Sequence, residues 1–189
     1  MGRLLQGNLI ASLALVSWLA MQAVHELGHV IGAWLTGGHV NRVDLYPTVI
    51  SRTDLSLNPH PLIVVWAGPL IGSLLPLAIW GLAIALWRRG TYLFRFFAGF
   101  CLIANGAYIG VGSFYRIGDA GDMLRYGSSP WQLWLFGATT IVGGPFLWNG
   151  LGAHFGFGRT NGQVSRGASI GCLIALAIFL AIELVVGSK

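Results

Sequence analysis

Charged residues are scarce in this sequence of 189 residues. Aspartate and glutamate number six, lysine and arginine eleven, and the four types together make up 9% of the chain, against about 25% in an ordinary soluble domain. Hydrophobic residues make up 55%, and the mean hydropathy is +0.71. This balance excludes an ordinary soluble domain and indicates an integral membrane protein, with the lipid bilayer as its main surroundings.

Cysteine and clustered positive charge are also nearly missing. The two cysteines, Cys101 and Cys172, lie in apolar segments and are too far apart for a short-spaced metal motif, so we expect them to be small buried side chains. Apart from the Arg88-Arg89 pair, the basic residues stand singly. A nucleic-acid binder normally carries a clustered basic patch, so no nucleic-acid partner is expected.

Long apolar runs dominate what is present. Each is long enough to cross a hydrocarbon layer of ~30 Å as a helix, and the first is longer than the apolar region of a cleavable signal peptide, so we expect it to be retained. The sequence predicts an all-α integral membrane protein, one transmembrane domain over residues 1–189 with about five transmembrane helices. The predicted segments are 8–36, 62–87, 91–112, 131–150 and 168–187.

Residues 39–60 differ from the apolar segments on either side of them. They follow the pair Gly37-Gly38, a plausible helix C-cap, and mix β-branched residues with Asn, Asp, Ser, Thr and Pro. This composition is typical of short strands and turns. The sequence therefore predicts a short strand-like loop after the first helix.

The first apolar segment contains the motif His25-Glu26-Leu27-Gly28-His29. Residues four apart lie on one face of a helix, so both imidazoles can reach one ion. Glu26 is then placed to hydrogen-bond a water on that ion and to act as the catalytic base. The alternative is a pair of core histidines with Glu26 as counter-ion. Ionisable residues are costly inside a membrane and usually mark a site, which favours a metal.

A catalytic zinc takes three protein ligands and one water. Leu35 stands where a metzincin would have its third histidine, which excludes that class. The third apolar segment would cross the membrane in the same direction as the first. Asp119 and Asp122 follow the third segment, so they would lie on the same side of the membrane as the end of the first segment that carries the histidines. Asp119 has small neighbours that allow close approach and is the predicted third ligand. Asp122 is the alternative ligand, or a hydrogen-bonding partner of one.

These residues resemble the site-2 protease family, zinc metalloproteases that cut peptide bonds within the membrane. The resemblance rests on "HELGH" in a membrane helix, the Gly-Gly and strand-like loop after it, "AGP" at 67–69, and an Asn followed by an Asp after the third segment. It covers residues 10–127 as a metalloprotease-like core. Residues 128–189 are then an additional two-helix C-terminal segment.

The resemblance implies one catalytic Zn²⁺, bound by His25, His29 and an aspartate that matches Asp119. Glu26 would be the catalytic acid and base, and Asn105 a substrate-orienting residue. The substrate would be a helix of a membrane protein, and the site would lie nearer the cytosolic side. The basic residues are nearly balanced between the two faces and do not choose an orientation.

This chain departs from the family pattern in two places. Gly72 stands where the family often has an asparagine, and the spacing from Asn105 to Asp119 is longer than usual. We also expect no additional sensor domain, such as a PDZ module, within 189 residues.

The leading prediction is a membrane-embedded zinc metalloendopeptidase that acts on membrane proteins. Its main alternative is a catalytically silent metalloprotease-like subunit that serves as a scaffold in a larger membrane complex. The presence of Glu26 favours the enzyme, because a structural zinc site does not need it. A small transporter that uses Glu26 as a proton relay would explain the buried charge but not the histidine spacing.

Overall fold

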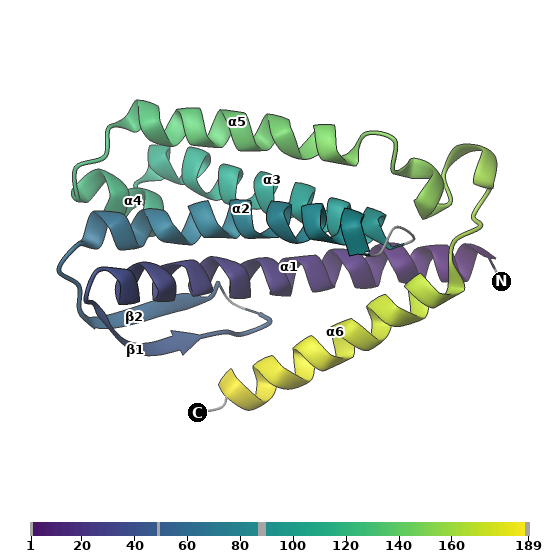
Figure 1. The fold of residues 1–189 in the computed structure, drawn as a ribbon, viewed down its shortest axis with the longest axis horizontal. Coiled ribbons are helices and arrows are strands. Elements are labelled where there is room, and N and C mark those ends of the chain that lie inside the picture. Colours follow the sequence, from purple (N-terminus) through teal and green to yellow (C-terminus); the bar gives the residue numbers. More distant parts are fainter. Residues whose placement is uncertain (1, 49, 87–89, 188–189) are drawn as a thin grey trace.

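The computed structural model describes residues 2–48, 50–86 and 90–187, so the Arg88-Arg89 pair lies outside the described residues. Long helices run side by side, and a hairpin lies along the C-terminal half of the first helix (Figure 1). In chain order the elements are α1 (Gly2–Leu35), β1 (His39–Asp44), β2 (Arg52–Leu57), α2 (Pro61–Leu86), α3 (Thr91–Tyr115), α4 (Gly118–Arg125), α5 (Pro130–Trp148), the 3-10 turns η1 (Gly152–Phe155) and η2 (Gly158–Thr160), and α6 (Arg166–Gly187).

The predicted fold class is confirmed, because the chain is mostly helical with a strand hairpin after the first helix. Each predicted apolar segment forms a long helix. Among the described residues, four helices are long and apolar enough to cross a membrane: α1, α2, α3 and α6. The fifth long helix, α5, lies along α3. It contains Trp131, Gln132 and two threonines and is not among these four helices. The chain is therefore a multi-pass membrane protein.

The end of α1 turns the chain into the hairpin. Gly37 has φ +75°, a left-handed conformation that favours glycine, and the Gly38 N–H donates to the Ala33 carbonyl at 2.7 Å. These contacts form the glycine C-cap that the sequence predicts. Strands β1 and β2 then pair antiparallel in a two-stranded sheet, and the chain returns to begin α2 beside the end of α1 (Figure 1).

Glycines let the helices approach backbone to backbone. A Cβ added at Gly28 of α1 would lie 2.4 Å from the Ala67 carbonyl oxygen of α2, and one added at Gly137 of α5 would lie 2.9 Å from the Gly110 Cα of α3. Such contacts are typical of membrane helices, in which close van der Waals packing drives association. They fix α2 against α1 and α5 against α3.

Two apolar clusters lie at opposite ends of the bundle. The first joins α1 and α3 to the segment between α5 and α6, where Leu151 and Phe155 are buried and Gln6 donates to the Phe155 carbonyl at 2.8 Å. The sequence predicts only a glycine-rich loop there. The second cluster encloses α4, whose Ala120 and Met123 are fully buried against residues of α2, α3 and α5. The sequence predicts a loop at α4 as well.

Candidate metal centre

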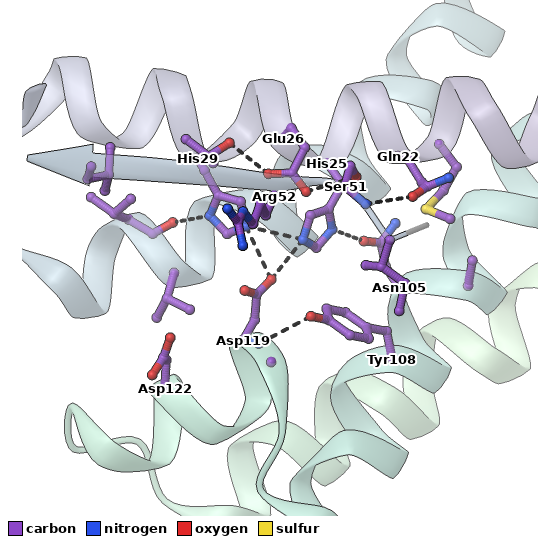
Figure 2. A pocket seen from close by; sticks show the side chains of 18 of the residues that line it. Gln22, His25, Glu26, His29, Ser51, Arg52, Asn105, Tyr108, Asp119 and Asp122 are labelled. Carbon is purple, nitrogen blue, oxygen red and sulfur yellow. Dashed lines mark hydrogen bonds and ion pairs between the residues drawn. The ribbon is translucent and has the colours of Figure 1, made fainter. Parts of the chain in front are cut away.

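Three side chains from two distant parts of the sequence meet beside α1. The Nε2 atoms of His25 and His29 lie 3.2 Å apart, and Oδ2 of Asp119 lies 2.8 Å from the first and 3.2 Å from the second (Figure 2). Both histidines are buried, and Asp119 is partly buried. One turn of helix separates the histidines, and the first turn of α4 supplies the aspartate.

These separations suit one ion bound by all three atoms. Zinc–ligand distances of 2.0–2.1 Å in a tetrahedral arrangement place neighbouring ligand atoms about 3.3 Å apart. A Cβ at Gly68 of α2 would lie 2.4 Å from Nε2 of His29 and 3.0 Å from Nε2 of His25. Glycine at this position therefore lets the two imidazole rings pack directly against α2. The donor set and its separations fit a zinc ion, and Gly68 gives room to the two rings that supply the nitrogen donors.

Close packing holds Asp119 in place. Gly118 has φ +53°, and a Cβ there would lie 2.2 Å from the Tyr108 hydroxyl, to which the Asp119 N–H donates at 3.3 Å. Burial raises the pKa of Asp119, but hydrogen bonds from His25 and His29 in their protonated, imidazolium form, and the attraction of that charge, outweigh the burial and hold the pKa well below its usual range. Asp119 is thus a carboxylate, the form that binds a metal.

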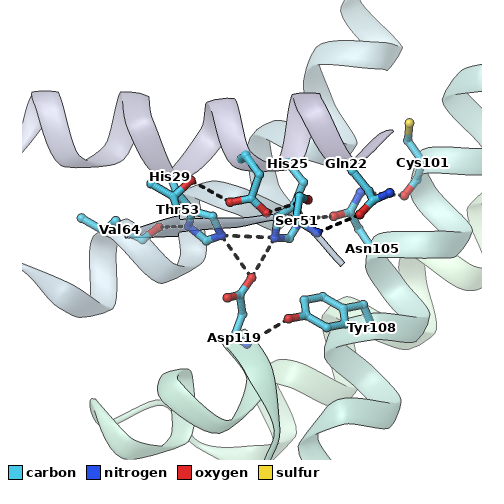
Figure 3. Close-up of polar contacts among 11 residues, drawn as sticks. Gln22, His25, His29, Ser51, Thr53, Val64, Cys101, Asn105, Tyr108 and Asp119 are labelled. Atoms are coloured by element: carbon cyan, nitrogen blue, oxygen red, sulfur yellow. Dashed lines mark hydrogen bonds and ion pairs between the residues drawn. The ribbon is translucent and has the colours of Figure 1, made fainter. Parts of the chain in front are cut away.

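Glu26 lies beside the cluster and belongs to a different set of contacts. It is buried, and both of its carboxylate oxygens accept hydrogen bonds from the hairpin (Figure 3). The Ser51 hydroxyl donates to Oε1 at 3.0 Å, and the Thr53 hydroxyl donates to Oε2 at 2.7 Å. The Gln22 side chain accepts from the Ser51 N–H at 2.9 Å. The hairpin therefore fixes the direction of the Glu26 carboxylate.

The Nδ1 atoms of the two histidine rings also have partners within the protein. Nδ1 of His29 lies 2.9 Å from the Val64 carbonyl oxygen, and Nδ1 of His25 lies 2.6 Å from Oδ1 of Asn105 (Figure 3). Asn105 is almost completely buried, and its Nδ2 donates to the Cys101 carbonyl at 2.9 Å. Each ring thus presents its Nε2 atom to the other ring and to Asp119.

The remaining predicted candidates lie around this cluster. Asp122 lines the same cleft, one helical turn from Asp119, but is not one of the three clustered donors. In the hairpin, Asp44 ends β1 and pairs with Arg42 and Arg52, and Asp54 of β2 pairs with Arg52, so both take part in ion pairs away from the three clustered donors. The structure therefore brings together His25, His29 and Asp119.

A cleft of about 520 Å³ opens onto these residues. Its walls come from α1, the hairpin, the start of α2, α3 and α4, and they include apolar side chains such as Trp18, Leu55 and Val65 together with the polar cluster. A largely apolar cleft with a few convergent polar groups is the usual form of a binding site.

Sequence reasoning missed the residues that support the site. Ser51 directly precedes β2 and Thr53 is two residues further on, a spacing that puts two hydroxyls on one side of an extended segment, and Gln22 stands four residues before Glu26 on one face of α1. Both patterns are visible in the sequence. The contact of Tyr108 with Asp119 has no comparable signal, because it depends on how α4 folds back onto α3.

Comparison with known proteins identifies the family. The family model described as Peptidase M50B-like matches residues 8–110, more than half of the chain. The chain belongs to this family. The resemblance to site-2 proteases is thereby confirmed. Neither curated proteins nor solved structures gave a match.

The matched region contains His25, Glu26, His29 and Asn105 but ends before Asp119. The family is zinc-dependent, and this chain has a His-x-x-x-His pair with an aspartate as a candidate metal site. The third donor is therefore placed by the fold and not by the family match.

Replacement of Gly68 by alanine should weaken zinc binding. The new Cβ would fall on the imidazoles, and disturbing the surroundings of metal ligands typically costs about 10–100-fold in affinity. The zinc dissociation constant is measured by chelator competition on the purified protein. Gly81→Ala is the matched control, because it lies in the same helix with no atom within 4 Å of the added Cβ. Equal zinc affinities for the two variants would show that the room at Gly68 does not matter for zinc binding.

Proposed function

We propose that this protein is a membrane-embedded zinc endopeptidase that cleaves peptide bonds of membrane proteins within or next to the bilayer. The observation that carries the proposal is the cluster of His25, His29 and Asp119 beside Glu26, in a cleft among membrane-spanning helices. Membership of a peptidase family adds weight to it. His25, His29 and Asp119 would hold the zinc, which leaves one position open, as catalytic zinc sites require.

The bound zinc would supply Lewis acidity toward a carbonyl and a water acidified to near-neutral pKa. Glu26 would take the proton of the attacking water and later deliver it to the leaving amine. This role requires a carboxylate that faces the site without binding the metal. Glu26 meets the requirement, because the hydroxyls of Ser51 and Thr53 hold both of its oxygens beside the cluster.

The substrate class follows from where the cleft lies. A segment that reaches it through the bilayer is apolar, and while helical its carbonyls are engaged in intrahelical bonds, so it must unwind before attack. Strand β2 lines the cleft, and its only partner among the described residues is β1. We propose that the unwound substrate pairs with the other edge of β2. We propose, by analogy with the family, that this end of the bundle lies near the cytosolic side, so that cleavage would fall toward that boundary.

Glu26→Gln should abolish cleavage while zinc stays bound. Loss of general acid–base catalysis costs about 10²–10⁴-fold in kcat, and an amide keeps the shape of the side chain. Single-span membrane substrates in proteoliposomes provide the assay, with cleavage sites mapped by mass spectrometry. Glu183→Gln makes the same chemical change outside the cluster and should cleave normally.

Two outcomes would overturn parts of this proposal. Stoichiometric zinc with no cleavage by the wild-type protein would favour the scaffold alternative. Cleavage mapped to the boundary opposite the site would contradict the proposed orientation.

Asp119→Ala should abolish zinc retention, whereas Asp122→Ala should only weaken it. Asp119 supplies an oxygen 2.8 and 3.2 Å from the two histidine nitrogens, whereas Asp122 only lines the cleft. The two residues share one short helix, so each variant controls for the other. Zinc content after gel filtration is measured by elemental analysis. The reverse order would make Asp122 the ligand.

Proline substitutions at Thr53, Leu55 and Leu57, made one at a time, should identify the strand edge that receives substrate. A proline removes one backbone N–H, so a variant that loses a bond to substrate should show a raised KM with unchanged zinc content. Alanine at the same positions controls for the side chain. If every folded proline variant cleaves like its alanine counterpart, the strand-pairing proposal fails.

A further inference from the structure

The hydrogen bond between Asn105 and His25 leads to an inference that rests on the proposed function and deepens it. Asn105 comes from α3, and its side chain is only 1% exposed. In Figure 3 it lies on the far side of the His25 ring from Asp119. Its partners fix how the amide must be oriented.

The amide has a single orientation consistent with its neighbours. A carbonyl oxygen only accepts hydrogen bonds, so the group 2.9 Å from the Cys101 carbonyl must be the NH₂ of Asn105. The amide oxygen, Oδ1, then faces Nδ1 of His25 at 2.6 Å. Because Oδ1 has no hydrogen to donate, Nδ1 of His25 must carry the proton.

This proton position determines what the other nitrogen can do. A neutral imidazole has one protonated and one unprotonated nitrogen, so Nε2 of His25 is left with its lone pair facing the cluster. His29 reaches the same state through the Val64 carbonyl, 2.9 Å from its Nδ1. A backbone carbonyl stays in place whatever residue occupies position 64. The partner of His25 is a side chain and can be removed by substitution.

The fold makes room for this amide. A Cβ at Gly72 of α2 would lie 2.9 Å from Oδ1 and 3.0 Å from Nδ2 of Asn105. Glycine at position 72 therefore leaves the space that the Asn105 side chain fills. Position 72 is one turn along α2 from Gly68, whose missing side chain leaves space for the two imidazole rings. Two glycines on one face of α2 thus accommodate the histidines and the residue that orients one of them.

We propose that Asn105 is a positioning residue for zinc, which holds His25 in the Nδ1-protonated tautomer and fixes its ring, and is not a substrate-orienting residue. Both polar atoms of its amide already bond within the protein. Partners behind metal-bound histidines commonly set their tautomer and basicity, and their loss costs about 10–100-fold in metal affinity.

The first test measures zinc affinity by chelator competition on full-length protein in detergent. Asn105→Leu removes the acceptor at similar size and should weaken zinc binding about 10–100-fold. Asn105→Asp restores an acceptor for Nδ1–H and should recover most of the loss. Ser73→Ala is the control for a buried polar deletion nearby, because the Ser73 hydroxyl is buried without a partner among the described residues. Wild-type affinity for Asn105→Leu, or equal loss in Asn105→Asp, would overturn the proposal.

The second test separates positioning from substrate contact. At saturating zinc, Asn105→Leu should recover wild-type KM and most of kcat, because its defect lies in metal binding. A residue that orients substrate would leave KM raised however much zinc is added. A persistently raised KM in zinc-saturated Asn105→Leu would therefore overturn the proposal.

The third test needs neither metal nor activity. In metal-free protein labelled with ¹⁵N-histidine, at alkaline pH where imidazoles are neutral, His25 should be protonated at Nδ1. In Asn105→Leu the proton should move to Nε2, where Asp119 can accept it. His25→Gln assigns the signals. An Nε2-protonated His25 in the wild type would overturn the proposal, even for a protein that bound zinc. A wild type that bound no zinc would refute the proposed function and leave this measurement valid.

Discussion

The close approach of α1 and α2 is the constraint on which the rest of the structure depends. At Gly28 the backbone of α2 lies where a Cβ would otherwise be, and at Gly68 the histidine rings of α1 fill the equivalent space. Leucine or valine at either position would separate the two helices, and the imidazoles would lose the surface of α2 against which they pack. In a bilayer, where burial of apolar surface does not drive association, such contact contributes both packing energy and position. The two helices thereby form one rigid side of the cleft.

The polar residues at the site stabilise one another. An ionisable or amide group inside a membrane is costly unless its donors and acceptors are matched. Each imidazole here has a hydrogen-bond acceptor at Nδ1, Glu26 accepts two hydroxyl bonds, and the Asn105 amide bonds at both ends. Because these bonds are buried, losing one partner leaves another group unsatisfied, which costs more than the bond itself contributes. The hydrogen bonds within the protein therefore contribute to the order of these side chains.

The sequence allowed the helices, the hairpin and the histidine pair to be predicted, because each depends on local periodicity or on spacing within one turn. The direction of successive crossings was enough to bring Asp119 to the same end as His25. What could not be predicted depends on tertiary contacts. Helix α4 has only eight residues and two glycines, so it owes its form to burial of Met123 and Ala120. Nothing local to Asn105 indicates that it bonds a histidine eighty positions away.

Two separate elements, the hairpin and α3, hold the polar side chains of the cleft. The hairpin holds Glu26, and α3 holds His25 through Asn105, so the proposed base and one of the proposed metal ligands are oriented by separate elements. Strand β2 lines the cleft, and a movement of this strand would reach Glu26 through the Thr53 hydroxyl and through Ser51, which directly precedes the strand. Both imidazoles belong to α1, which packs against α2 through glycine contacts, and they would stay in place. Under the proposed function, this arrangement lets Glu26 respond to substrate while His25 and His29 keep their geometry, as catalysis by a preorganised site requires.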